Sequence, residues 1–207
     1  MRPDLAMIST WIKPGSKVLD LGCGDGELLW YLQKEKQVIG YGLEIDAANI
    51  EKCIERGINV IEQDLDDGLD NFKAGAFDFV IMTQALQAVR YPEKVLNDML
   101  RLGQESIITF PNVGHWYGRL QLAFKGSMPV TDALPHTWYN TPNIHLCTFR
   151  DFEKLCSEKN IHIVDCDVID HQYRSNILSR CLPNLFGEIA IYRLTRKTTS
   201  THPKGSV

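Results

Sequence analysis

The chain has 207 residues, of which 44% are hydrophobic and 23% are charged, and its formal net charge is −4. This length suits a single domain whose core is large enough to need neither disulfides nor a structural metal. The slight acidity excludes nucleic-acid binding by phosphate neutralisation. No apolar run approaches the roughly 18–20 residues that span a bilayer. The first 17 residues show no signal-peptide pattern, so we expect a cytoplasmic protein.

The cysteines contain neither a Cys-x-x-Cys pair nor the close Cys/His spacing of a zinc finger, so we expect no metal site. Their even number leaves disulfides conceivable. A cytoplasmic location favours reduced, buried or half-buried thiols instead. The six positions are Cys23, Cys53, Cys147, Cys156, Cys166 and Cys181.

Short apolar stretches alternate with stretches of helical spacing through the first half of the chain. Strands are expected at 17–21, 37–45, 59–63, 77–82 and 106–110, and helices at 26–34, 46–56 and 93–102. This alternation predicts βαβ units. The fold class is therefore α/β, with a mostly parallel sheet and helices on both of its faces.

The alternation stops at Pro111. Residues 111–149 carry six of the chain's 19 Phe, Tyr and Trp residues, so we expect an aromatic-rich insertion there. The pattern then resumes with a helix expected at 151–159 and two final strands expected at 161–169 and 187–194. We expect one domain, residues 1–197, followed by a flexible polar tail, residues 198–207.

A glycine-rich segment, Gly22-Cys-Gly-Asp-Gly26, follows the first expected strand and precedes the first expected helix. Gly22 and Gly24 would let the chain turn tightly and approach a ligand. Dinucleotide loops read Gly-x-Gly-x-x-Gly, whereas this loop reads Gly-x-Gly-x-Gly. The carboxylates of Asp20 and Asp25 would repel a diphosphate but suit a cationic amino group. S-adenosylmethionine (SAM) carries such a group.

Further acidic and polar residues follow the next three strands. Glu44 is placed to bind a ribose diol, and Asp64 to accept from an adenine amino group beside the Leu65 side chain. Thr83 and Gln84 would line the reactive end. Each acid alone could be a helix cap or a surface residue, but together they predict an adenosyl ligand, SAM or S-adenosylhomocysteine (SAH). The expected cofactor-binding residues are Asp20, Gly22, Gly24, Gly26, Glu44, Ile45, Asp64, Leu65, Thr83 and Gln84.

Three segments, VLDLGCGDG, GLEID and EQDL, resemble motifs of class I SAM-dependent methyltransferases. The resemblance covers about residues 15–110. It implies a Rossmann-like, seven-stranded, mostly parallel sheet of spatial order 3-2-1-4-5-7-6 with one antiparallel hairpin.

The segment after the fourth strand, residues 82–90, lacks the features of several methyltransferase classes. It has neither the Asp/Asn/Ser-Pro-Pro-aromatic sequence of amide methylases nor a Pro-Cys nucleophile. Ala88 stands where many small-molecule methyltransferases have histidine. The remaining candidates for a general base lie in the insertion: His115, Tyr117, His136, Tyr139 and His145. His115, beside the fifth strand, is the least unfavourable of them.

Segments at 110–116, 126–129, 134–148 and 184–192 resemble the MetW family of methionine biosynthesis proteins, and the resemblance spans nearly the whole chain. That family is associated with the homoserine O-acyltransferase MetX, whose activity it supports. No methyl acceptor is established for the family.

Two functions follow from this resemblance. In the first, which we favour, the chain is a SAM- or SAH-binding partner of MetX whose insertion, including Trp116 and Trp138, contacts the acyltransferase. In the second it is a methyltransferase acting on an oxygen or nitrogen nucleophile of a small molecule. Neither function requires a nucleic acid, a membrane or a metal.

Overall fold

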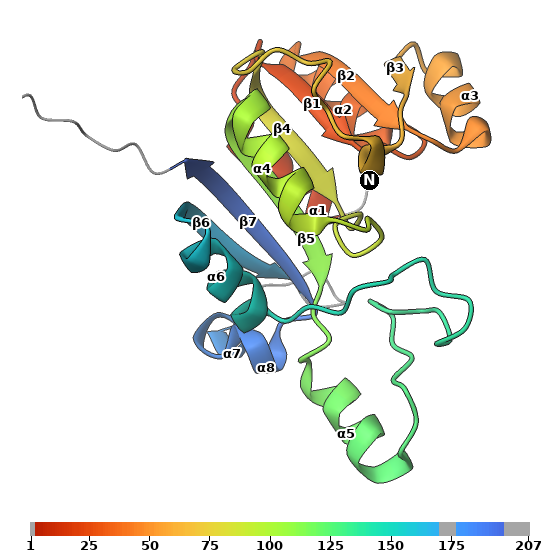
Figure 1. Cartoon of the computed structure of the whole chain (residues 1–207), viewed down its shortest axis with the longest axis vertical. Helices are drawn as coiled ribbons and strands as arrows, with labels where there is room; N and C mark the ends of the chain where they lie inside the picture. Colours follow the sequence, from red (N-terminus) through yellow and green to blue (C-terminus); the bar gives the residue numbers. More distant parts are fainter. Residues whose placement is uncertain (1–2, 170–176, 197–207) are drawn as a thin grey trace, which may run out of the picture.

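The computed structural model of the chain describes residues 3–169 and 177–196 (Figure 1). The predicted tail, residues 198–207, lies outside them. The described strands are β1 (Lys17–Leu21), β2 (Ile39–Glu44), β3 (Asn59–Glu62), β4 (Phe77–Thr83), β5 (Gly103–Pro111), β6 (Ile161–Ile169) and β7 (Ile189–Arg196). The helices are α1 (Pro3–Trp11), α2 (Glu27–Lys36), α3 (Ala47–Glu55), the 3-10 turn η1 (Leu65–Asp67), α4 (Pro92–Leu102), α5 (Trp116–Lys125), α6 (Phe149–Glu158), α7 (Ile177–Cys181) and α8 (Pro183–Phe186).

All seven strands form one sheet of order β3-β2-β1-β4-β5-β7-β6. Strands β1 to β5 pair in parallel, whereas β7 pairs antiparallel with both β5 and β6. The predicted fold class and strand order are confirmed. The fifth strand begins at Gly103 instead of Ser106, because Gly103 leaves α4 in an extended conformation and pairs directly with Phe77.

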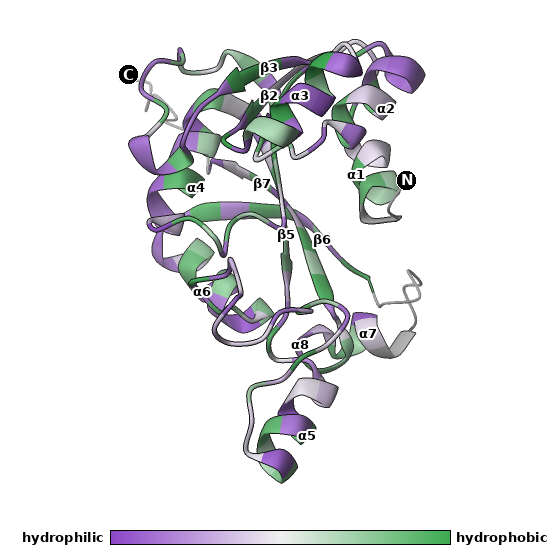
Figure 2. Ribbon diagram, turned by 90° about the vertical axis from the view of Figure 1, so that its right-hand side faces the viewer, coloured by the Kyte–Doolittle hydropathy of each residue, from purple (hydrophilic) through white to green (hydrophobic). Residues whose placement is uncertain are grey.

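Helices cover both faces of the sheet, and alternate residues of each strand enter one of two cores. Leu19 and Leu21 of β1 belong to the core under α4 and α6. Val18 belongs to the core under α1 and α2, with Leu29 of α2 fully buried there. Hydrophobic residues accordingly recur along the central strands (Figure 2).

Two helices of nine or more residues were absent from the sequence prediction. In α1, Leu5 and Ile8 face the core, and Ile12, directly after the helix, continues this spacing of three and four residues. Helix α5 lies inside the insertion and ends at Gly126, whose φ of 65° is left-handed. Both views place α5 at one end of the molecule, remote from β3 (Figures 1 and 2). The η1, α7 and α8 turns were also not predicted.

The cysteines are all reduced, with Cys23, Cys53 and Cys156 buried and Cys147 half-buried. Cys166 and Cys181 are exposed, so the expectation of burial was wrong for these two. Among the described helices, none combines the length and apolarity that a bilayer crossing requires.

Candidate functional site

A cleft of about 600 Å³ opens at the carboxyl ends of β1, β2 and β4, the edge at which open α/β sheets bind their ligands. It is lined by nine of the ten residues predicted to bind a cofactor, namely Asp20, Gly22, Gly24, Glu44, Ile45, Asp64, Leu65, Thr83 and Gln84. Gly26 is the exception. The topology thus brings together side chains from positions 20 to 84 of the chain.

The three glycines of the loop between β1 and α2 have left-handed backbones but different surroundings. Gly22, Gly24 and Gly26 have φ of 70°, 55° and 77°. A Cβ at Gly26 would lie 2.9 Å from the Cys53 sulfur, so Gly26 serves packing behind the cleft. A Cβ at Gly24 would meet nothing within 4 Å, because this residue faces the cleft. Close approach of a ligand to backbone therefore concerns Gly24 and not Gly26.

Glu44, at the end of β2, holds the glycine loop in place. Its Oε2 accepts from the Gly24 N–H at 2.7 Å, and its Oε1 accepts from the N–H groups of Ile45 and Asp46 at 2.9 and 3.0 Å. A carboxylate offers about four acceptor positions, so backbone uses three and one remains for a ligand hydroxyl. Sequence reasoning assigned only the ligand role and missed the loop contact.

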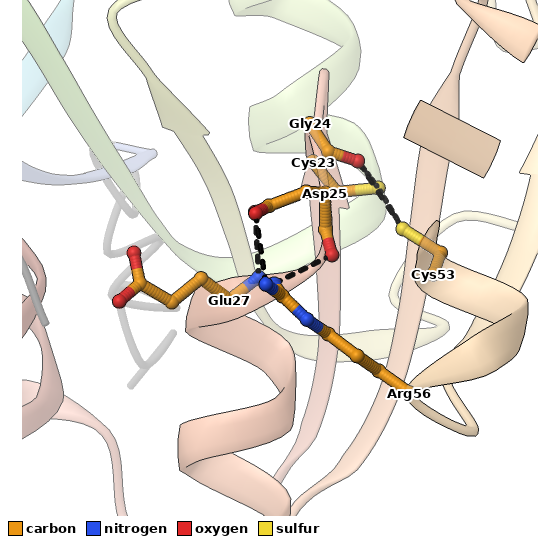
Figure 3. A network of polar contacts seen from close by, with 6 residues as sticks. All are labelled: Cys23, Gly24, Asp25, Glu27, Cys53 and Arg56. Atoms are coloured by element: carbon orange, nitrogen blue, oxygen red, sulfur yellow. Dashed lines mark hydrogen bonds and ion pairs between the residues drawn. The ribbon is translucent and has the colours of Figure 1, made fainter. Parts of the chain in front are cut away.

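The Asp25 carboxylate forms an ion pair with Arg56. It lies 3.0 Å from the Arg56 guanidinium, which also donates to the Asp25 carbonyl at 2.8 Å (Figure 3). The Glu27 N–H donates to Asp25 Oδ1 at 3.2 Å. Sequence reasoning placed Asp25 near a cationic ligand but missed this ion pair, because Arg56 arrives from the end of α3, 31 residues away in sequence.

Two buried thiols support the same loop. The sulfurs of Cys23 and Cys53 lie 3.9 Å apart, and Cys53 donates to the Gly24 carbonyl at 3.2 Å (Figure 3). Burial raises the pKa of both thiols above the ordinary value, most strongly for Cys23. Neutral thiols are weak nucleophiles, so these side chains pack the loop instead of supplying chemistry.

The third acidic position begins η1. Asp64 Oδ1 accepts from the Asp66 N–H at 2.9 Å, which is the geometry of a helix N-cap. Asp66 also lines the cleft, and its Oδ1 accepts from the Arg90 N–H at 2.8 Å. Asp64 therefore stabilises the turn that places Asp66 in the lining of the cleft.

From the end of β4 onward, the residues that line the cleft are polar at positions 83 and 84 and apolar at positions 88 and 89. Gln84 has a left-handed φ of 53°, and its N–H donates to the carbonyl and hydroxyl oxygens of Thr109 at 2.9 and 3.0 Å. A left-handed non-glycine residue is uncommon and costs free energy, so two hydrogen bonds stabilise it here. Ala88 and Val89 follow as cleft-lining residues.

Among the described residues that line the cleft, six are acidic and none is Lys, Arg, His or Tyr. The acidic residues are Asp20, Asp25, Glu27, Glu44, Asp64 and Asp66. Asp20 is only 1% exposed and Glu44 only 9%. Such a lining opposes an anionic ligand and favours one that carries positive charge. It also provides no conventional general base other than carboxylate.

The candidate base His115 lies elsewhere. It lines a separate small pocket formed by the insertion, where its Nε2 is 3.8 Å from Glu188 Oε1. His136 lines that second pocket too, whereas His145 places its Nε2 3.2 Å from the Arg90 carbonyl oxygen. Tyr117 and Tyr139 are exposed. None of these five residues lines the cleft, and no described group of three or more His, Cys, Asp or Glu side chains could hold a metal.

Comparison with known proteins identifies the family. The model of the family described as "Methionine biosynthesis protein MetW" matches residues 2–194. The chain belongs to the MetW family. It is also 34% identical over 196 residues to the bifunctional methionine biosynthesis protein MetXA/MetW of Rhodopirellula baltica. The MetW-family chain aligns over 90% of its own length there, but it spans only 31% of that relative.

Solved structures share the fold of this MetW-family chain. A SAM-dependent methyltransferase from Mesorhizobium loti has a TM-score of 0.68 at 14% identity, covering 94% of this chain and 98% of that one. The [4+2]-cyclase SpnF has a TM-score of 0.65 at 15% identity, covering 94% and 80%. Proteins named for different reactions therefore share this class I fold, which does not by itself determine chemistry.

Proposed function

We propose that this chain is a SAM- or SAH-binding partner subunit that supports the homoserine O-acyltransferase MetX in methionine biosynthesis. The observation that carries the partner role is the relative whose single polypeptide is named for both MetXA and MetW. Its MetW-like portion corresponds to this chain, and joining two modules in one polypeptide raises their effective concentration for each other.

The acidic cleft supports the ligand assignment. SAM carries an ammonium and a sulfonium, and SAH retains the ammonium, so carboxylates would stabilise either ligand where a diphosphate would be repelled. Asp20 would face the amino group, and the remaining acceptor position of Glu44 would take a ribose hydroxyl. Asp64 would accept from the adenine amino group beside Leu65. The volume of about 600 Å³ is within the range of small-ligand sites.

The reactive end of the cleft supports a binding role over catalysis. Bound SAM would supply an electrophilic methyl group. Methyl transfer to an oxygen or nitrogen nucleophile also needs an aligned acceptor and, in general, a residue that takes its proton. Ala88 and Val89 occupy the place where such a residue is sought, and His115 lies in another pocket.

An acyltransferase assay tests this function. Purified MetX is assayed with and without the chain while SAM or SAH is titrated. We expect higher acyltransferase activity with the chain, and a dependence on nucleotide concentration that shifts to higher concentrations in the Glu44→Gln variant. Equal MetX activity with and without the chain would overturn the proposal.

The methyltransferase alternative is separated by a second measurement. Methyl-labelled SAM is incubated with the chain and a small-metabolite extract. A labelled product that Asp20→Ala abolishes would establish the enzyme. Tight SAM binding without any labelled product agrees with the partner role.

A further inference from the structure

The insertion presents an unusually apolar surface. Only three residues between 112 and 148 are charged, although charged residues make up 23% of the chain. Depletion of charge together with exposed aromatic residues is typical of the centre of a protein–protein interface. We call residues 137–146 the strap. Its large hydrophobic side chains are each more than half exposed: Trp138 at 75%, Tyr139 at 72%, Ile144 at 57% and Leu146 at 53%.

The strap is attached to the wall of the acidic cleft. The backbone N–H groups of Ile144 and His145 both donate to the Gln87 carbonyl oxygen, at 2.9 and 3.0 Å. Gln87 is 1% exposed and its side chain donates to the Pro111 carbonyl at 3.1 Å, so this anchor is fixed to the end of β5. Gln87 directly precedes Ala88, which lines the cleft.

The strap also contributes to the cleft itself. Pro142 lines the cleft, whereas Trp138 and Tyr139, four and three residues earlier, project into solvent with their rings 5.7 Å apart in an edge-on arrangement. One short segment therefore joins a ligand-facing residue to an exposed aromatic pair.

We propose that the strap is the docking surface for the acyltransferase partner and that a ligand in the cleft strengthens this docking through Pro142. This inference rests on the proposed function. A ligand that contacts Pro142 restrains the strap, so the partner loses less conformational entropy when it binds the same segment. Linkage then requires the partner to tighten nucleotide binding by the same factor.

The partner that we propose to bind the strap is MetX and not a second copy of the chain. The fused relative provides this argument, since a MetXA portion accompanies a MetW portion in one polypeptide and the present chain spans only 31% of it. Trp and Tyr are the residues that most often dominate binding energy at interfaces, which places the centre of the contact on Trp138 and Tyr139.

The test measures the affinity of the full chain for purified MetX by calorimetry, without nucleotide and with saturating SAH. We expect SAH to tighten the complex by about fivefold or more. Trp138→Ala is expected to weaken it by about tenfold or more, while SAH binding to the isolated variant stays unchanged and shows that it is folded. Pro142→Gly is expected to bring the SAH-dependent factor close to one.

Phe124→Ala is the matched control, because Phe124 is 84% exposed in the same insertion but lies on α5, outside the strap and the cleft. It is expected to keep wild-type affinity. An effect of Phe124→Ala as large as that of Trp138→Ala would place docking on α5 and overturn the inference, as would a complex insensitive to SAH. Self-association of the chain that depends on Trp138 would assign the strap to a second copy. Failure of the wild-type chain to bind MetX at all would instead overturn the proposed function.

Discussion

The carboxylate of Glu44 and the backbone of Gly24 are joined by a hydrogen bond of 2.7 Å, which connects the end of β2 to the glycine loop. The same carboxylate closes the turn after β2 through the N–H groups of Ile45 and Asp46. Glu44 therefore shapes the floor of the cleft and at the same time presents a negative charge to it.

Glu44→Gln is expected to weaken SAH binding by roughly 10- to 100-fold. The carboxamide has one acceptor oxygen and turns an N–H group toward backbone donors, and each lost charge-assisted hydrogen bond contributes about 1.5–3 kcal/mol. Calorimetric titration of the variant measures the change. Glu62→Gln is the matched control, because Glu62 pairs with Glu44 in the β2–β3 register but is exposed and absent from the cleft lining. Equal affinity of both variants would contradict the role of Glu44.

Gly24→Ala and Gly26→Ala are expected to separate ligand binding from stability. Both force alanine into a left-handed backbone, at about 1–2 kcal/mol each. At Gly26 the new Cβ would also press on the Cys53 sulfur, adding overpacking of about 1–3 kcal/mol. At Gly24 the Cβ would enter the cleft and reduce SAH affinity instead.

Urea denaturation and calorimetry on the two glycine variants provide the measurements. We expect Gly26→Ala to lose more unfolding free energy than Gly24→Ala. We expect Gly24→Ala to lose more SAH affinity relative to its loss of stability. The reverse pattern would show that Gly24 does not face the ligand.

Asn112 is expected to be a stability determinant at the start of the insertion. Its side chain donates to the Gly187 carbonyl at 2.7 Å and accepts from the Gly114 N–H at 2.9 Å, and the residue is 3% exposed. Asn112→Ala leaves these buried groups unpaired and should lower the unfolding free energy by about 2–3 kcal/mol. Asn59→Ala, which removes one long hydrogen bond of 3.4 Å to Gly40, should cost much less. Thermal or urea unfolding compares the two variants.

Tyr192 is expected to make stability depend on alkaline pH. It is fully buried and donates to Glu153 Oε1 at 3.0 Å, and burial raises the pKa of its phenol well above the ordinary 10.0. A raised folded-state pKa means that this contribution is complete below pH 10 and is lost as the pH rises further, because only the unfolded chain ionises. The slope is about 1.4 kcal/mol per pH unit for one proton.

Tyr192→Phe removes that titration, so the stability difference between wild type and variant should shrink as pH rises above 10. Urea unfolding at a series of pH values measures it, and the difference between the two proteins cancels the titration of groups that do not interact with Tyr192. A difference that stays constant with pH would contradict the assignment.

Local patterns predicted the strands and placed acidic residues at successive strand ends, which a parallel sheet collects at one edge, whereas the strand order came from the resemblance to class I SAM-dependent methyltransferases. The same patterns missed Arg56 beside Asp25 and Pro142 beside the cleft. Both contacts join segments distant in sequence, and no periodicity encodes where such segments meet. Helix α5 escaped prediction although Trp116, Leu120 and Phe124 recur every four residues, and the structure leaves all three exposed instead of packing them on the core.

Calorimetric titration of the purified chain with SAM, SAH and NAD tests directly whether a cleft lined by carboxylates selects an adenosyl ligand that bears an ammonium group. We expect saturable heat with SAM or SAH and none with NAD, whose diphosphate would face Asp20 and Glu44. Binding of NAD together with silence toward both SAM and SAH would contradict this expectation.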